Sequence, residues 1–207
     1  MPVIAMVGNK GGAGKTTLSI NLASYLAKNS ATVVVDADPQ GSALQWRAFA
    51  ENKNTVPIIE ASDQLVTQAK KLLQDYQYVL FDCPPSVQAS QTITVLGFSD
   101  IALIPVQPSP VDLWATVHIE EAVMRVREIN AHLRAILVIN QLEVRTTLSR
   151  LVRDALREIG LPVADAALRR RAIFRSSALE GKSVFDMGSR GNDAAQEIEQ
   201  LIEEVIV

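Results

Sequence analysis

The residues with the clearest chemistry lie near the N-terminus, at positions 8–17, which read GNKGGAGKTT. An apolar run, Val3 to Val7, precedes them and predicts a short buried strand, and apolar residues at helical spacing follow them. A glycine-rich turn between a strand and a helix presents backbone N–H groups at the helix N-terminus, which is a ready site for phosphate. Lys15 can reach the β- and γ-phosphates of a nucleotide, and the Thr16 hydroxyl can ligate Mg²⁺.

The loop departs in one place from the strict phosphate-loop pattern G-x-x-x-x-G-K-[ST], because Asn9 stands where that pattern has its first glycine. The variant K-G-G-x-G-K-[ST] fits, with its early lysine at Lys10. This stretch resembles the deviant Walker A motif of the ParA/MinD ATPases. The resemblance implies that Lys10 crosses a dimer interface to the phosphates bound by the partner subunit. The alternative interpretation is a glycine-rich turn with two solvated lysines.

Carboxylates follow two further apolar runs, Asp36 and Asp38 after one and Asp82 after another. At strand ends they suit Mg²⁺ and an attacking water, although either segment in isolation would favour a turn residue or a helix N-cap. They resemble the switch I D-x-D-P-Q and switch II D-x-P-P segments of the ParA family. That resemblance implies that Asp38 orients the hydrolytic water and that Asp82 is the Walker B residue. Thr16, Asp36 and Asp82 are the implied metal site.

Asn140 follows the apolar run Ala135 to Ile139, and its amide can donate to and accept from an adenine. MinD-like ATPases often place an asparagine here; a turn role is the alternative. The GTPase signature N-K-x-D is not met, since residues 140–143 read NQLE, so we predict ATP rather than GTP. The predicted nucleotide-binding residues are Lys10, Gly11, Gly12, Ala13, Gly14, Lys15, Thr16, Thr17 and Asn140, and the predicted catalytic residues are Lys10, Lys15 and Asp38.

The sharpest charge feature is the run 168–177, LRRRAIFRSS, which has four arginines in seven residues. Arginine pairs with phosphate in bidentate geometry, and such clusters bind the nucleic-acid backbone without reading sequence. In ParA-type proteins a late basic helical region of the ATP-bound dimer binds non-specific DNA. The alternative is a solvated helix face or internal salt bridges. The predicted DNA-binding residues are Arg169, Arg170, Arg171, Arg175 and Lys182.

The formal net charge of −3 hides an uneven distribution. Residues 125–190 carry 13 basic and 7 acidic residues, whereas residues 191–207 carry 5 acidic residues and no basic one. The basic segment predicts a localised anionic partner. The acidic C-terminal helix would be repelled by anionic lipid, and no run of 18 apolar residues exists, so we predict no membrane binding. Without a secretory signal, the predicted compartment is the cytoplasm.

Cys83 is the only cysteine, and His118 and His132 are the only histidines. One cysteine excludes an intrachain disulfide and a Cys-x-x-Cys metal site. Two isolated histidines make a poor metal cluster. A metal-cluster carrier of the NifH/Mrp kind needs bridging cysteines, so it is disfavoured as well.

These site residues need a scaffold that brings separate loops together. Uninterrupted Val/Ile/Leu runs indicate strands buried on both faces, and the helical patterns between them predict a doubly wound α/β fold with a mainly parallel sheet flanked by helices. Ligands of such folds bind at the carboxyl ends of strands, where the candidate residues lie. The predicted strands are 3–7, 32–35, 56–59, 78–81, 101–104 and 135–139, and the predicted helices are 18–26, 42–52, 63–73, 113–129, 149–159 and 193–205.

The length of 207 residues suits one domain, so we predict a single P-loop ATPase domain over 1–207. Because a strand is predicted to begin at Val3, we expect no N-terminal helix-turn-helix domain of the kind found in longer ParA proteins. The segment 104–110, IPVQPSP, predicts a rigid extended loop. It resembles the corresponding loop of small plasmid-partition ParA proteins of the ParF type, in which this region lies near the dimer interface.

The resemblance covers essentially the whole chain and implies a Mg²⁺-dependent ATP hydrolase with slow intrinsic turnover. With ATP it would form a sandwich homodimer that binds non-specific DNA, and hydrolysis, accelerated by a ParB-like partner, would release it. The predicted function is segregation of plasmid or chromosomal DNA. The alternative is the same switch positioning a protein cargo, a microcompartment or a chemoreceptor cluster, on the nucleoid. Intact Asp38 and Asp82 argue against a scaffold that binds ATP without hydrolysing it.

Overall fold

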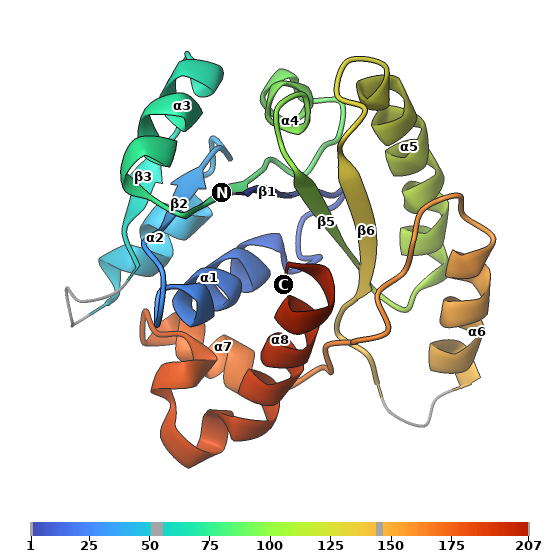
Figure 1. The fold of residues 1–207 in the computed structure, drawn as a ribbon. Coiled ribbons are helices and arrows are strands. Elements are labelled where there is room, and N and C mark those ends of the chain that lie inside the picture. The colour runs from blue at the N-terminus through green and yellow to red at the C-terminus, as the bar shows by residue number, and fades with distance from the viewer. Residues whose placement is uncertain (1, 51–55, 144–146, 207) are drawn as a thin grey trace.

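The computed structural model describes residues 2–50, 56–143 and 147–206, with the side chains of 147–150 excepted. Its centre is one six-stranded sheet in the order β3-β2-β4-β1-β5-β6, in which all neighbouring strands are parallel (Figure 1). The strands are β1 (Val3–Met6), β2 (Thr32–Asp36), β3 (Ile58–Glu60), β4 (Tyr78–Asp82), β5 (Ile101–Val106) and β6 (Arg134–Ile139). The central strands are buried on both faces, which confirms the doubly wound fold predicted from their uninterrupted apolar runs.

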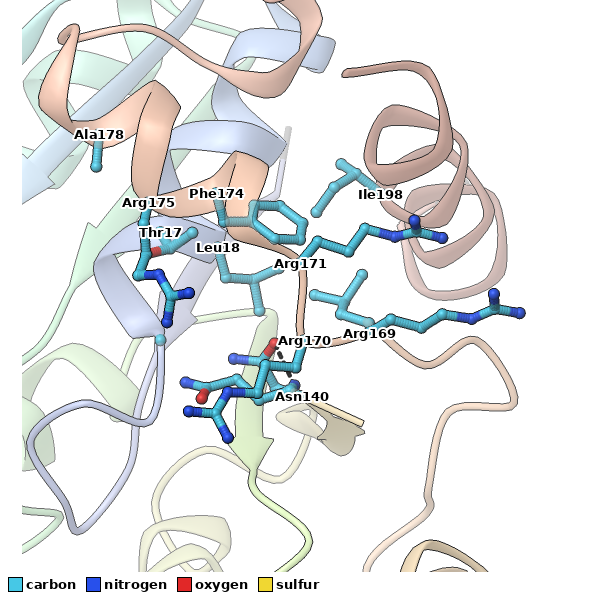
Figure 2. Close-up of a pocket in the computed structure, with 13 residues that line it drawn as sticks. Thr17, Leu18, Asn140, Arg169, Arg170, Arg171, Phe174, Arg175, Ala178 and Ile198 are labelled. Carbon is cyan, nitrogen blue, oxygen red and sulfur yellow. Dashed lines mark hydrogen bonds between the residues drawn. The ribbon is translucent and has the colours of Figure 1, made fainter. Parts of the chain in front are cut away.

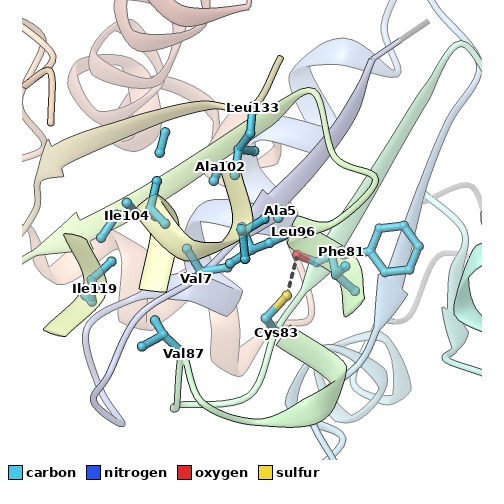
Figure 3. Close-up of a cluster of buried hydrophobic side chains, with 14 of the residues drawn as sticks. Ala5, Val7, Phe81, Cys83, Val87, Leu96, Ala102, Ile104, Ile119 and Leu133 are labelled. Carbon is cyan, nitrogen blue, oxygen red and sulfur yellow. Dashed lines mark hydrogen bonds between the residues drawn. The ribbon is translucent and has the colours of Figure 1, made fainter. Parts of the chain in front are cut away.

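Helices cover both faces of the sheet. One face packs against α3, α4, α5 and α6 through a core cluster that includes Cys83 and Phe81 (Figure 3). The other face packs against α1, α2, α7 and α8. The helices are α1 (Lys15–Leu26), α2 (Ser42–Ala48), α3 (Leu65–Asp75), α4 (Ser90–Leu96), α5 (Pro110–Arg127), α6 (Thr147–Arg157), α7 (Ala172–Leu179) and α8 (Asn192–Val205), with short 3₁₀ turns at Val184–Asp186 and Gly188–Gly191.

The proline-dense segment differs from its prediction. We expected strand β5 to end at Ile104 and an extended loop to follow, but the strand continues through Pro105 to Val106. Val7 N donates to Leu103 O, so the position of Pro105, two residues later, faces the same neighbour, β1, which has already ended. A missing N–H costs nothing there.

Helix α5 begins three residues before the predicted start. The Ser109 hydroxyl accepts a hydrogen bond from the backbone N–H of Asp112, and Pro110 occupies the first helical position. Both are strong helix-start signals. Two short helices, α4 and α7, were not in the prediction. The predicted helix 42–52 ends at Ala48, and its last two residues lie outside the described part of the chain.

The C-terminal helix α8 turns its apolar residues into the protein. Ile198, Leu201 and Ile202 are fully buried in the cluster that also holds the apolar face of α1. This apolar face of α8 is therefore covered by the rest of the protein. Among the described residues, no helix combines the length and the apolar character needed to cross a bilayer.

Candidate nucleotide and magnesium site

The phosphate loop connects the end of β1 to the start of α1. Gly14 is the N-cap of α1 and has a φ of 96°, and Gly12 has a φ of 79°. Both angles lie in the left-handed region, which side chains with a Cβ adopt at a cost. A Cβ on Gly14 would also lie 2.2 Å from Nδ2 of Asn140. Glycine is therefore required at this position for two separate reasons.

Three amide side chains hold the loop from outside. Asn140 Nδ2 donates to Ala13 O at 2.7 Å, and Gln107 and Gln141 both donate to Gly12 O, at 2.6 and 3.0 Å. Carbonyl oxygens bound in this way point outward, which leaves the N–H groups of the loop for an anion. Asn140 also accepts from Gln141 N at 2.9 Å, so its observed contacts are structural. Its role in adenine recognition stays a prediction.

Lys15 is a buried cation at this anion site. Its side chain is 7% exposed, and Nζ donates to Lys10 O at 3.3 Å. Burial lowers the pKa of Lys15, and the nearby carboxylates of Asp82 and Asp38 offset part of that effect. A buried ammonium group is costly unless an anion joins it. This arrangement fits the phosphates of a nucleotide.

Thr16 and Asp82 lie together, as predicted for a magnesium site. Thr16 Oγ1 donates to Asp82 Oδ2 at 2.6 Å, and Ser19 Oγ donates to Asp82 Oδ1 at 3.2 Å. Burial raises the pKa of Asp82 to about 7, against the opposing effect of the Thr16 hydrogen bond. A hydroxyl and a carboxylate beside a phosphate site are the oxygen ligands that Mg²⁺ prefers. The residues present therefore fit this ion.

Asp36 and Asp38 differ in their surroundings. The buried Asp36 carboxylate accepts hydrogen bonds at 2.9 Å from the backbone N–H groups of Ala43 and Leu44, at the start of α2. Burial raises the pKa of Asp36, and these bonds offset part of the shift. Asp38 is half-buried, and its Oδ1 accepts from Gln40 N at 3.0 Å. Asp36 thus orients the loop that carries Asp38, and its predicted support of the metal is untested.

Lys10 does not point into its own phosphate site. Its Nζ lies 3.0 Å from Oδ2 of Asp112, which is 6% exposed and belongs to the first turn of α5. Ser109 also donates to that carboxylate oxygen. The sequence analysis missed Asp112, because an aspartate in the first turn of a helix gives no signal of a distant lysine partner.

The arginines of the basic run separate into two groups. Figure 2 shows Arg169 and Arg171 pointing toward α8, whereas Arg170 and Arg175 lie on the side of Asn140. Arg171 contacts Glu197 at 2.8 Å and Asp193 at 2.9 Å. The other pairs are Arg169 with Glu197 at 3.5 Å, Arg170 with Glu143 at 2.6 Å and Lys182 with Glu180 at 2.8 Å.

Arg175 is exposed on α7, and its side chain has no hydrogen-bond or ion-pair partner within the described ranges. The internal salt bridges that we gave as the alternative interpretation of the basic run are therefore present at its first three arginines. Arg145 and the side chain of Arg150, which could extend a basic surface, lie outside the described part of the chain.

A pocket of about 170 Å³ lies between the phosphate loop and these arginines. Gly14, Thr17 and Asn140 line it on the loop side. Its apolar wall consists of Leu18, Leu168, Phe174, Ala178 and Ile198, and the side chains of Arg170 and Arg175 flank it (Figure 2). Such a space beside a phosphate site suits a flat, largely apolar ring.

Residues 4–184 match the family described as the CobQ/CobB/MinD/ParA nucleotide binding domain. The chain belongs to this family. It is 39% identical over 206 residues to maintenance of carboxysome distribution protein A of Halothiobacillus neapolitanus, which covers 98% of this chain and 95% of the relative. It is 26% identical over 239 residues to the sporulation initiation inhibitor protein Soj of Bacillus subtilis, with 91% and 93% covered.

The fold is shared with solved structures. An ATP complex of McdA from Cyanothece has a TM-score of 0.76 at 16% identity and covers 98% of this chain and 95% of that chain. MinD of Pyrococcus horikoshii with Mg-ADP has a TM-score of 0.71 at 21% identity, with 95% and 93% covered. As a ParA-family P-loop protein, the chain is an ATP hydrolase that uses ATP and Mg²⁺, and the surroundings of Lys15, Thr16 and Asp82 agree with this.

Asp82→Asn should abolish ATP hydrolysis and stabilise the nucleotide-free protein at pH 8. The folded pKa of about 7 lies above the reference value of 3.8. The folded state therefore binds more protons between these values, and the wild type loses stability as pH rises through that window. Urea unfolding at pH 5.5, 7 and 8 measures the difference between the two proteins. The difference in unfolding free energy between the variant and the wild type should grow with pH. A difference that is equal at all three pH values would contradict the cost of burying the Asp82 carboxylate.

Gly14→Ala should destabilise the folded protein by more than the roughly 1–2 kcal/mol expected for the left-handed backbone alone, because its Cβ also meets Asn140. Thermal melting of the nucleotide-free protein measures the loss. Gly11→Ala is the matched control, since its Cβ would meet nothing within 4 Å. Adding Asn140→Ala to Gly14→Ala should restore part of the stability. No recovery would show that the contact with Asn140 is unimportant.

Arg171→Ala should lower the unfolding free energy by about 1–3 kcal/mol, because the Glu197 carboxylate, which is only 11% exposed, loses a charged partner. Arg175→Ala should leave stability nearly unchanged, since its side chain is exposed. Urea unfolding of both variants compares them directly. Equal stability of the two variants would show that the bridge to α8 contributes little.

Proposed function

We propose that this chain is a ParA-type positioning ATPase. With ATP and Mg²⁺, two copies form a sandwich dimer that binds DNA of any sequence, and hydrolysis releases the dimer. The observation that carries the proposal is the opposite placement of two lysines in one loop. Lys15 is buried at the phosphate site, whereas Lys10 has a 46% exposed side chain that faces α5. Because Lys10 does not point into its own phosphate site, exchanging its Asp112 partner for the phosphates of a second copy would not disturb the contacts of Lys15.

The residues of each chain divide the work. Lys15 and the N–H groups of the loop bind and neutralise phosphate oxygens, and Thr16 and Asp82 hold the metal ion, which supplies charge neutralisation. Asp38 orients the attacking water from the half-buried loop after β2. Lys10 leaves Asp112 when the second copy arrives, and the Ser109 hydroxyl remains to hydrogen-bond the Asp112 carboxylate.

The pocket beside Asn140 is the proposed site of the adenine ring. Its apolar wall would cover the faces of the base, and the Asn140 amide retains one donor and one acceptor beyond its contacts with Ala13 and Gln141. We take residues 1–207 as one P-loop ATPase domain, which the continuous six-stranded sheet supports.

DNA binding by the dimer rests in this proposal on Arg175 first, because Arg169, Arg170, Arg171 and Lys182 already have acidic partners. Exchange of those partners for phosphate would bring further arginines to the DNA. The ATP-bound protein would then be cytoplasmic and associated with the nucleoid.

We propose a protein assembly as the cargo. Two of the most similar relatives, at 39% and 29% identity, are both maintenance of carboxysome distribution proteins. This supports a carboxysome-like microcompartment, reached through an adaptor that stimulates hydrolysis. Segregation of plasmid or chromosomal DNA with a ParB-like adaptor is the second candidate. It is supported by the similarity to Soj and by the shared fold of a plasmid partition protein from Borrelia burgdorferi.

The proposed binding to non-specific DNA is tested by measuring how the protein binds random duplex DNA in the presence of ADP and of a non-hydrolysable ATP analogue. We expect binding with the analogue alone, weakened on the order of 10³-fold between about 50 and 200 mM salt for about six phosphate contacts. Lys10→Ala should bind the analogue but neither dimerise nor bind DNA, and Lys15→Ala should lose nucleotide binding. Salt-insensitive binding, or a Lys10→Ala protein that dimerises, would contradict the mechanism.

The cargo is tested by deleting the gene in source cells. We expect clustered or unevenly inherited microcompartments, with plasmid loss rates unchanged. A raised plasmid loss rate with normal microcompartment distribution would favour the second candidate.

A further inference from the structure

We propose that Asn9 is a positioning residue that couples the loop after Asp82 to helix α5. Through Asn9, a change in this loop between the ATP-bound and ADP-bound states would be transmitted to α5. The inference rests on the proposed nucleotide switch and adds the residue that links its moving parts. It concerns a position at which this chain departs from the strict phosphate-loop pattern.

The Asn9 side chain joins two segments that are distant in sequence. Its Oδ1 accepts a hydrogen bond from Val87 N at 2.9 Å, in the loop that follows Asp82. Its Nδ2 donates to Ala115 O at 3.3 Å, in the second turn of α5. An amide is suited to this task because it carries an acceptor and a donor on one short side chain.

Val87 and Ala115, the two residues that Asn9 connects, both lie in well-packed or regular structure. The Val87 side chain is 1% exposed in the core, and Pro84 and Pro85 stiffen the chain before it. These features restrict the independent movement of single residues in the loop after Asp82. At the other end, Ala115 belongs to an 18-residue helix that begins with a capped turn.

Asn9 and Lys10 contact successive turns of the same helix. Lys10 Nζ lies 3.0 Å from Asp112, and Asn9 Nδ2 lies 3.3 Å from Ala115 O, one turn further on. The helix that holds Lys10 in the structure is thus tied through Asn9 to the loop that carries the metal-site aspartate. A shift of that loop on binding or losing a γ-phosphate would move the carboxylate that holds Lys10.

The glycine of the strict pattern could make neither hydrogen bond. The chain does not need glycine's freedom at this position either, because Gln141 is the only non-glycine residue with positive φ among the described residues. At this position the chain therefore has a side chain that connects two segments, in place of a glycine that would allow an unusual backbone conformation.

The test compares Asn9→Ala and Asn9→Gly with Asn130→Ala. Asn130 is a matched control because its side-chain amide also makes two hydrogen bonds to the backbone. Its Nδ2 donates to Leu96 O at 2.9 Å and to Ser99 O at 2.8 Å, just beyond the far end of α5. We expect the Asn9 variants to keep KM for ATP within about threefold and to lose kcat about tenfold. Asn130→Ala should lower Tm and leave kcat within about twofold.

Amide hydrogen exchange measures the coupling between the loop after Asp82 and helix α5 directly. In the wild type, a non-hydrolysable ATP analogue should slow exchange relative to ADP both in residues 83–89 and in residues 110–118. In the Asn9 variants only residues 83–89 should respond. The comparison is repeated in a Lys10→Ala background, in which the protein is expected to stay monomeric. Any response of residues 110–118 then arises within one chain, so a failure of the proposed dimer is distinguished from a failure of the coupling.

The proposal is overturned if residues 110–118 of the Asn9 variants respond as in the wild type. It is also overturned if Asn130→Ala lowers kcat as much as Asn9→Ala does, since the effect would then follow from loss of stability alone. Asn9→Gly provides the measurement if Asn9→Ala does not fold, because glycine is the residue of the strict pattern.

Discussion

The site depends on the outward carbonyl groups of its own loop. A loop that turns its N–H groups toward an anion must turn carbonyl oxygens away from it, and those oxygens need donors. The donors are the amides of Gln107, Asn140 and Gln141, which follow β5 and β6. The phosphate loop is therefore held by strands that come more than 90 residues later, and its shape is completed only when the sheet is complete.

Local patterns made much of this predictable. The apolar runs marked the central strands of the sheet, because a strand that is buried on both faces shows no alternation of apolar and polar residues. Since parallel strands place their carboxyl ends at one edge, the sequence also predicted that Lys15, Thr16, Asp38 and Asp82 would gather there. These inferences needed only the order of the residues along the chain.

What escaped prediction depends on contacts between distant segments. Asp112, Gln107 and Gln141 look like ordinary helix-start and loop residues until the fold places them beside Lys10 or Gly12. Asn9 alone gave a signal, a polar residue where the pattern has glycine. Helix α4 escaped because its seven residues are too few for a clear period.

Charge illustrates the same limit in another way. The basic run and the acidic C-terminal helix look like separate features in the sequence, one for an anionic partner and one repelled by lipid. In space they neutralise each other, since Glu197 contacts both Arg169 and Arg171. The acidic partners therefore offset part of the charge of the first three arginines, whereas the exposed side chain of Arg175 on α7 has no such partner among the described residues.

Pro105 has a consequence for how the sheet assembles. Because it lacks an N–H, it is tolerated in β5 only where β1 has already ended. A slip of β5 by two residues toward the start of β1, the smallest shift that keeps the same side chains inside, would bring Pro105 opposite a β1 carbonyl and leave that oxygen without a donor. The proline thus disfavours that slip, and in the observed register Gln107 Nε2 lies 2.6 Å from Gly12 O of the phosphate loop.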